Sequence, residues 1–379
     1  MKKFVFYNPT QIVFGENQTK NIGRYLKNKK CLLLYGGGSI KQNGIYDKVM
    51  DSLKNHNVSV VEKSGVKPNP VLSFVYEAIE LAKKEKVDCI LAVGGGSVID
   101  SAKAIAAGFY YDGDVWDFFT DKAQIKEALP IYVVLTLAAT ASEMNSGAVI
   151  TNENTKQKFN IRSDNLFPKI SILDPINTYT VPKNHVANGS VDAIVHVLEG
   201  YFTRKYPSTP IQDGFVETIV ETVVSSTKQI LENPTDYDAR ANFMWSATLA
   251  LNGLTTAGIG DYAFPNHMMG HSLSALYDIA HGSTLSIAFP AWLRYNSKNL
   301  NERLKRFGSR VFGTQEPQKT IEAIENYFAS IGAPTRLKDV GLNESDIEAI
   351  AQNAVALAQK WNLTEYTKER IAEILKYAI

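Results

Sequence analysis

The first half of the chain alternates between short apolar runs and longer amphipathic stretches. The runs 31–38 ("CLLLYGGG") and 89–96 ("CILAVGGG") are rich in Leu, Ile and Val and end in glycines, which is typical of buried strands that lead into a tight turn. Residues 43–57 and 69–87 space their apolar side chains as amphipathic helices do. This alternation predicts a parallel sheet with helices on both of its faces, a Rossmann-like α/β fold.

The pattern changes near Pro182. After the segment 170–182, long helical patterns follow one another, as in 190–203, 212–232 and 237–254. With 379 residues, the chain is long enough for two domains. We therefore predict an α/β domain over 1–182 and an all-helical domain over 183–379.

Composition and charge narrow the possible functions. The chain has 40 Lys and Arg and 39 Asp and Glu, a formal net charge of +1, which provides no general attraction to nucleic acid or to an anionic membrane. The first apolar run is too short for a signal peptide, and the longest, 128–141, is too short to cross a bilayer. Cys31 and Cys89 lie in predicted strands and are expected to be buried. We expect a cytoplasmic protein with a small-molecule substrate.

Two glycine-rich turns are candidates for phosphate binding. Residues 35–39 ("YGGGS") and 93–97 ("VGGGS") each follow a predicted strand, and the second leads directly into a helix. Glycines let the backbone approach a phosphate, and the helix N-terminus attracts the anion. Neither turn has the G-x-G-x-x-G pattern, so a tight turn that binds nothing is the alternative. Two such turns at the same edge of a parallel sheet favour a ligand site, with residues Gly94, Gly95, Gly96 and Ser97 as the better candidates.

Potential metal ligands form two pairs at helical spacing. Asp192 and His196 are four residues apart, as are His267 and His271, so each pair lies on one face of a predicted helix. Three imidazoles and one carboxylate suit a divalent ion such as Zn²⁺ or Fe²⁺ and leave a position open for substrate. The alternative is a set of histidines in a helical core without any metal.

A third histidine of the same segment requires a turn. His281 lies fourteen residues beyond His267, and one straight helix would separate them by about 21 Å. If both side chains bind one ion, the chain must reverse within 276–282, where Gly282 offers a place for the first helix to stop.

At this point the motifs carry a resemblance to a known family. The segments "GGGSVIDSAKAIA", "TLAATASEMNSGAVI", "ANGSVDAIVHVLEGY" and "HMMGHSLSALYDIAHG" resemble those of iron-containing (group III) alcohol dehydrogenases, in particular the branch of NADP-dependent aldehyde reductases and butanol dehydrogenases. The resemblance extends over essentially the whole chain. It implies a dehydroquinate synthase-like architecture, in which 1–182 form the α/β nucleotide-binding domain and 183–379 the all-α metal-binding domain. We expect the active site in the cleft between them, where phosphates and metal would meet. The resemblance also implies a homodimer.

The resemblance also implies roles for individual residues. The metal ligands correspond to Asp192, His196, His267 and His281, and His271 is left beside the substrate as a proton relay or positioning group. The segment that the family writes "TTAGTGSE" reads "TLAATASE" here, with Ala139 and Ala141 in place of glycines. The implied cofactor contacts are Gly94, Gly95, Ser97, Asp100, Thr136, Thr140, Ser142 and Lys158.

The first glycine turn bears on the choice of cofactor. NAD-preferring relatives tend to have an acidic residue after this strand, whereas the segment 35–41 ("YGGGSIK") contains none. Gly37, Gly38 and Ser39 are placed to donate hydrogen bonds to a 2′-phosphate, and Lys41 to supply a positive charge. We therefore predict a preference for NADP(H) over NAD(H).

The resemblance implies hydride transfer between NADP(H) and a small primary alcohol or aldehyde, assisted by one Fe²⁺ or Zn²⁺ ion. A metal- and NAD-dependent lyase similar to dehydroquinate synthase is an alternative. Its polyanionic substrate would need cationic groups, and 190–200 and 260–278 contain no Lys or Arg. A non-catalytic metal or nucleotide sensor is a third possibility. We expect no nucleic-acid or membrane partner.

Overall fold

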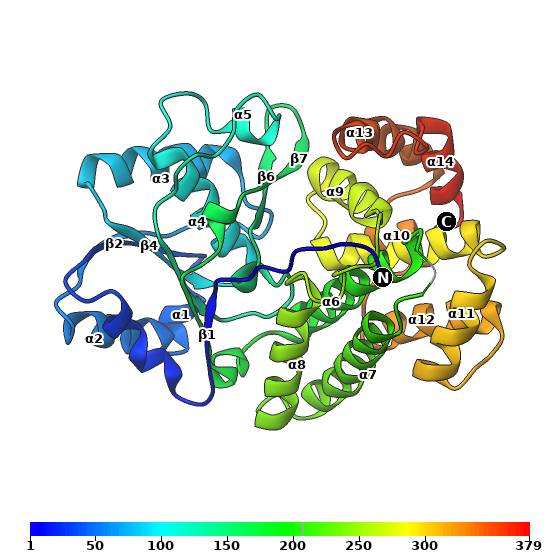
Figure 1. The fold of residues 1–379 in the computed structure, drawn as a ribbon, viewed down its shortest axis with the longest axis horizontal. Helices are drawn as coiled ribbons and strands as arrows, with labels where there is room; N and C mark the ends of the chain where they lie inside the picture. The colour runs from blue at the N-terminus through cyan, green and yellow to red at the C-terminus, as the bar shows by residue number, and fades with distance from the viewer. Residues whose placement is uncertain (207) are drawn as a thin grey trace. The chain divides into compact units, whose positions relative to one another are not determined.

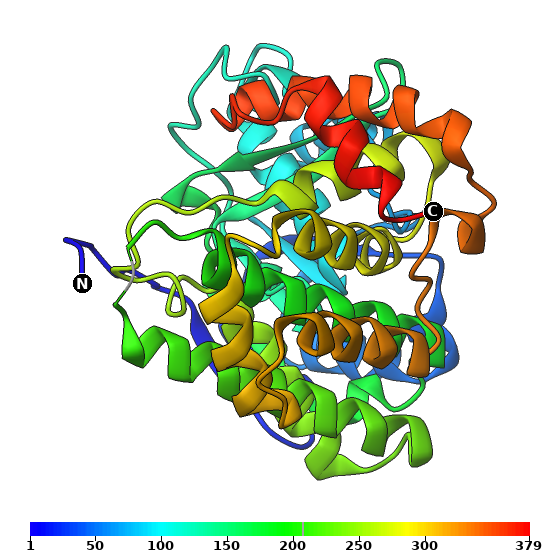
Figure 2. The same ribbon diagram turned by 90° about the vertical axis from the view of Figure 1, so that its right-hand side faces the viewer.

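The computed structural model describes residues 1–206 and 208–379 (Figures 1 and 2). The chain forms two compact units. The α/β unit comprises Tyr7–Val181 and Pro234–Thr248, and the helical unit comprises Met1–Phe6, Pro182–Asn233 and Leu249–Ile379. Within the described residues, we find no helix with both the length and the apolar character needed to span a membrane.

A single boundary at Pro182 does not separate the two units, because two segments belong to the unit formed mainly by the other half of the chain. The N-terminal residues belong to the helical unit, where the Lys2 amide donates to the Gly258 carbonyl oxygen at 2.9 Å. Residues 234–248 belong to the α/β unit, where the Thr248 hydroxyl donates to the Glu143 carboxylate at 2.6 Å. The hydrophobic pattern does not reveal these pairings because the partners are far apart in the sequence.

One parallel sheet forms the centre of the α/β unit, as predicted. Its strand order is β1-β8-β5-β4-β2-β3, and every neighbouring pair is parallel. The central strands are buried on both faces, which explains their continuous apolar sequences. A separate antiparallel pair is formed by β6 and β7. The strands are β1 (Gln11–Phe14), β2 (Lys30–Tyr35), β3 (Ser59–Lys63), β4 (Cys89–Gly94), β5 (Ile131–Leu135), β6 (Gly147–Asn152), β7 (Gln157–Arg162) and β8 (Ile170–Leu173).

Helices cover both faces of this sheet (Figure 1). On one face, Cys31 and Cys89 are register partners and pack in a core that includes α2. Burial raises the pKa of the Cys31 thiol to about 12, so this thiol is unreactive at neutral pH. On the other face, α4 packs on β4 and β6, with α3 behind it. The helices of this unit are α1 (Ser39–Gln42), α2 (Ile45–Lys54), α3 (Leu72–Glu85), α4 (Gly96–Phe109), α5 (Trp116–Phe119) and most of α8 (Tyr237–Ala250).

Two long buried helices organise the helical unit. α6 and α10 carry buried residues on nearly all sides, pack against each other and are surrounded by amphipathic helices (Figure 2). This explains why their sequences are apolar all round, while α12 and α14 have one apolar face. The helices are α6 (Lys183–Thr203), α7 (Pro210–Glu232), α9 (Pro265–Tyr277), α10 (His281–Asn296), α11 (Asn301–Phe307), α12 (Pro317–Ser330), α13 (Ile347–Lys360) and α14 (Lys368–Lys376).

A fully buried lysine connects α4 to the loop before β6. The Lys103 ammonium donates to the Ser142 hydroxyl at 3.0 Å, to the carbonyl oxygens of Asn145 and Gly147 at 2.8 and 2.7 Å, and to the Asn145 side chain. Burial lowers the pKa of Lys103 to about 8, although the nearby Asp100 carboxylate acts in the opposite direction. One side chain of α4 therefore contacts the loop 142–147 at three residues, Ser142, Asn145 and Gly147.

We expect Lys103→Met to lower the free energy of unfolding by about 2–4 kcal/mol, because it leaves several buried acceptors without a donor. Urea denaturation followed by circular dichroism measures this loss. Lys122→Met, at an exposed position of the same unit, should leave the stability unchanged. Equal stability of the Lys103 variant and the wild type would contradict the role of this lysine.

Candidate metal centre and nucleotide loops

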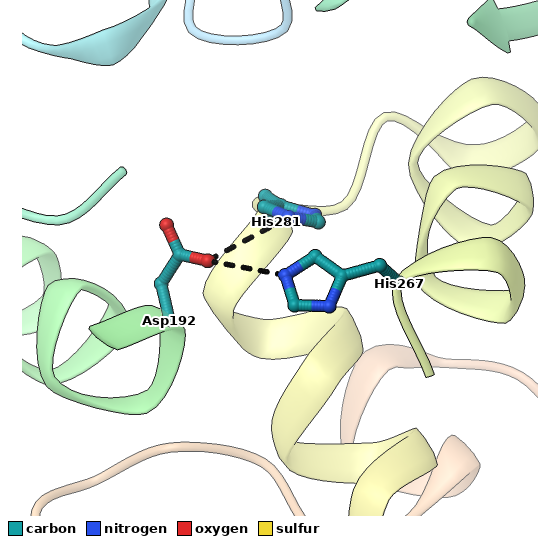
Figure 3. A group of neighbouring side chains, drawn as sticks. All are labelled: Asp192, His267 and His281. Carbon is teal, nitrogen blue, oxygen red and sulfur yellow. Dashed lines mark ion pairs between the residues drawn. The ribbon is translucent and has the colours of Figure 1, made fainter. Parts of the chain in front are cut away.

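Three potential metal ligands from separate helices meet in the helical unit. Asp192 lies on α6, His267 on α9 and His281 at the start of α10 (Figure 3). The Asp192 Oδ1 atom is 3.8 Å from His267 Nε2 and 3.7 Å from His281 Nε2. Their ligand atoms all lie within 4.8 Å of one another, an arrangement that can hold one ion.

His196 lies beside this group. It follows Asp192 by one turn of α6, and its Nδ1 atom is 3.4 Å from Asp192 Oδ1. Its ring stacks on that of His267 with a centroid distance of 4.5 Å. Burial lowers the pKa of His196 to about 4, so its imidazole is neutral at physiological pH, as a metal ligand must be.

The predicted chain reversal between His267 and His281 is present. α9 ends at Tyr277, Asp278 takes a left-handed conformation with φ 54°, and α10 begins at His281. The two imidazole centroids are 5.3 Å apart. Gly282 does not stop the first helix as expected. It lies in the first turn of α10, where a Cβ atom would come within 2.2 Å of the Asn188 carbonyl oxygen on α6.

His271 has different neighbours from the other three histidines. It is buried on α9, and its ring centroid lies 5.3 Å from that of His281 and 5.7 Å from that of Trp361. It is therefore close to the candidate metal centre but outside the group formed by Asp192, His267 and His281.

Glu199 is a member of this site that the sequence reasoning missed. Its Oε1 atom lies 3.2 Å from His267 Nδ1, and its side chain is fully buried. Burial lowers the pKa of His267, but the neighbouring carboxylates of Asp192 and Glu199 outweigh this effect and raise it overall. The spacing of Asp192, His196 and Glu199 along α6, four and then three residues, is the signal by which the sequence could have revealed this residue.

The unsatisfied atoms of the site fit a bound cation. His196 Nδ1 and His267 Nε2 are buried nitrogen atoms that lack a hydrogen-bond partner within the described part of the chain. Buried polar atoms normally have partners, and two such nitrogens facing one carboxylate oxygen fit a cation bound between them. Imidazole nitrogens together with one carboxylate are donors suited to Zn²⁺ or Fe²⁺.

The second glycine turn lies where β4 ends and α4 begins. Gly94 is the last residue of β4, and Gly95 precedes α4. A Cβ atom at Gly96 would come within 2.4 Å of the Thr140 hydroxyl, so this glycine allows the loop 136–142 to approach the helix closely. The Thr136 amide donates to the Gly94 carbonyl oxygen at 3.1 Å, which brings two of the predicted cofactor segments together.

Several predicted cofactor contacts form hydrogen bonds within the protein. The Asp100 carboxylate accepts from the Ser142 hydroxyl at 2.6 Å and from the Val149 amide at 2.9 Å. The Ser97 hydroxyl donates to the Pro68 carbonyl oxygen at 3.0 Å. These side chains hold the loops in place, which leaves backbone groups as the better candidates for direct phosphate contacts.

Two further residues, Ala141 and Lys158, belong to segments that the sequence predicts to contact the cofactor. Ala141 has φ 52°, in the left-handed region that favours the glycine found here in the family. An alanine therefore adopts a backbone conformation here that glycine takes more readily. Lys158 lies on β7, is buried, and donates from Nζ to the Asn69 side chain at 3.0 Å.

The first glycine turn has an acidic neighbour that the local sequence does not show. Glu62 of β3 accepts hydrogen bonds from the hydroxyls of Tyr35 and Tyr46 at 2.9 and 2.5 Å. Lys41 lies over both tyrosine rings, and its Nζ atom is 3.8 Å from Glu62 Oε2. The segment 35–41 contains no carboxylate, but pairing of β2 with β3 brings one close to Lys41.

Comparison with known proteins identifies the family. The model of iron-containing alcohol dehydrogenases matches residues 9–175, and the C-terminal model of the Fe-containing alcohol dehydrogenase family matches residues 186–379. The chain therefore belongs to the iron-containing alcohol dehydrogenase family.

Individual relatives match over at least nine-tenths of the chain. The chain is 43% identical to a probable NADH-dependent butanol dehydrogenase 1 of Bacillus subtilis, with 100% of both chains covered. It is 40% identical to the NADPH-dependent aldehyde reductase YqhD of Escherichia coli, with 92% of each covered. A crystal structure of NADH-dependent butanol dehydrogenase A from Thermotoga maritima superposes with a TM-score of 0.95 at 49% identity, over 100% of this chain and 99% of that one.

We expect Gly282→Ala to weaken metal binding at least 10-fold, because the added methyl group would push the start of α10, and with it His281, away from α6. Titration of the purified protein with Zn²⁺ against a chromophoric chelator measures the affinity. Gly214→Ala is the matched control, because a Cβ atom there meets nothing within 4 Å. Unchanged zinc affinity of the Gly282 variant would contradict this account.

Proposed function

We propose that this protein transfers a hydride between NADP(H) and a small primary alcohol or aldehyde, with one Fe²⁺ or Zn²⁺ ion held by Asp192, His196, His267 and His281. Its class, group III alcohol dehydrogenase, follows from the family. The observation that carries the metal assignment is the convergence of these side chains from three helices. Relatives named butanol dehydrogenase and aldehyde reductase support a short-chain substrate.

The chain's own residues prepare the site for this chemistry. When bound, the ion supplies a Lewis acid that polarises the oxygen of the alcohol or aldehyde. The burial of Asp192, His196 and His267 excludes water and strengthens their electrostatic interactions. His271 lies beside His281 and holds or delivers, at an imidazole nitrogen, the proton that the substrate oxygen loses or gains. A bound nicotinamide nucleotide would supply or accept the hydride.

The nucleotide is proposed to bind along the glycine turns of the α/β unit. The N-terminus of α4, a helix of 14 residues, favours the pyrophosphate, and Gly94, Gly95, Gly96 and Ser97 surround it. The 2′-phosphate of NADP is proposed to lie at Gly37, Gly38 and Ser39 near Lys41. An exposed glycine backbone supports this placement, since a Cβ atom at Gly37 or Gly38 would meet nothing within 4 Å.

The balance between NADP(H) and NAD(H) rests on Lys41 and Glu62. Two tyrosine hydroxyls and Lys41 surround the Glu62 carboxylate, and this arrangement offsets its repulsion of a 2′-phosphate. The names of the relatives include either NADH or NADPH, so this charge pair is where the preference must be tested.

A homodimer in the cytoplasm completes the proposal. Exposed apolar side chains in the N-terminal segment, with Val5 93% exposed, support a self-association surface.

His267→Ala should abolish metal binding and aldehyde-dependent NADPH oxidation while nucleotide affinity stays unchanged, because the proposed nucleotide loops belong to the α/β unit.

His271→Ala should retain the metal and lose about 100-fold in kcat, which is the scale of the contribution of one acid–base group. Elemental analysis, butanal reduction and NADPH fluorescence titration separate the two variants. Full activity of the first variant, or metal loss in the second, would contradict the assigned roles.

Lys41→Ala should lower kcat/KM for NADPH about 10-fold, or about 1.4 kcal/mol, and change that for NADH less than about twofold. Steady-state kinetics with each cofactor at a fixed butanal concentration measures both values. Lys27→Ala, at an exposed position of the same unit, is the control. An equal loss for both cofactors would place the 2′-phosphate elsewhere.

A further inference from the structure

Glu199 is a fully buried carboxylate that the proposed ligand set does not use. It lies on α6, and its exposed fraction is 0%. Its Oε1 atom accepts from the backbone amides of Asn266 and His267 at 2.8 and 2.9 Å, and its Oε2 atom from the Asn266 side chain at 3.1 Å. The His267 Nδ1 contact at 3.2 Å completes its surroundings.

These contacts define which nitrogen of His267 carries the proton. Oε1 already faces two backbone N–H groups, which can only donate, so this oxygen acts as an acceptor. His267 Nδ1 must therefore donate to it. In the neutral imidazole, the proton then lies on Nδ1, and the lone pair of Nε2 points toward Asp192 Oδ1, 3.8 Å away.

The same carboxylate also holds the start of α9. This helix begins at Pro265, its N-cap residue Phe264 provides no side-chain hydrogen bond, and its first turn contains no acidic residue. Glu199 instead accepts hydrogen bonds from the backbone amides of Asn266 and His267, the second and third residues of the helix, and interacts favourably with the helix dipole. One side chain from α6 therefore places the backbone of α9 and orients the ring that α9 carries.

We propose that Glu199 is a positioning residue for the metal centre. It fixes the proton of His267 on Nδ1, limits rotation of the ring, and raises the basicity of Nε2 toward a bound cation. This inference rests on the proposed function, because it requires His267 to bind metal through Nε2. Carboxylates that hold metal-binding histidines in this way typically change metal affinity 10- to 100-fold.

Glu199→Gln removes the negative charge while it keeps the shape of the side chain. The glutamine oxygen can still accept the two backbone amides. Its NH₂ group would face Asn266, whose buried Oδ1 atom lacks a hydrogen-bond partner within the described residues and can accept after a flip of the amide. Glu217→Gln is the matched control. Glu217 is also a buried glutamate of the helical unit, 4% exposed, and accepts from Tyr201 and Arg306.

Competition of the full-length proteins with a chromophoric chelator for Zn²⁺ should give a 10- to 100-fold weaker affinity for Glu199→Gln and a change below about twofold for Glu217→Gln. With Co²⁺ as probe, the visible absorption bands should shift in the first variant and stay unchanged in the second. Wild-type affinity and spectrum in Glu199→Gln, or equal losses in both variants, would overturn the proposal.

If Glu199→Gln does not fold, the wild-type protein loaded with zinc tests the role of Glu199 instead. Nitrogen-15 NMR of its six histidines should show a proton on Nδ1 of His267 and zinc on Nε2. Zinc on Nδ1 would overturn the role of Glu199. A wild-type protein that binds neither Zn²⁺ nor Co²⁺ would instead overturn the proposed metal centre, and this inference with it.

Discussion

The helical unit is organised around one buried carboxylate. Asp192 Oδ1 lies within 3.4–3.8 Å of a nitrogen atom from each of His196, His267 and His281. A buried negative charge is unfavourable unless donors or cations surround it, so α6, α9 and α10 must cross close to this atom. Two glycines allow that approach. Gly282 lies against α6, and a Cβ atom at Gly270 would come within 2.8 Å of the Thr284 hydroxyl on α10. The same close approach of these helices therefore both packs them together and assembles the candidate metal centre.

The parts of the fold with strong local patterns could be predicted from the sequence. The apolar runs around Cys31 and Cys89 are central strands of a parallel sheet because such strands are covered on both faces. The helical spacing of Asp192 with His196 predicted neighbours on one face of α6. The reversal before His281 followed from helix length alone, since two ligands of one ion cannot be about 21 Å apart.

Features that depend on distant partners could not be predicted in this way. Glu199 shares a face of α6 with Asp192, but its role becomes visible only when the start of α9 is placed against it. Glu62 approaches Lys41 through strand pairing, although twenty residues separate them in the sequence. Gly282 is of a residue type that often ends a helix, yet here it allows α10 to contact α6 closely. In each case, the local pattern is compatible with several neighbours, and tertiary packing selects one.

The network around Lys103 has a consequence for ligand binding. Because this ammonium, Asp100 and Ser142 tie α4 to the loop 142–147 through interactions inside the protein, that loop is ordered before any nucleotide arrives. The conformational entropy of the loop is lost during folding and not during association. If the nucleotide binds as proposed, a larger share of the contact energy then appears as affinity, and the left-handed conformation of Ala141 is held by its fully buried surroundings.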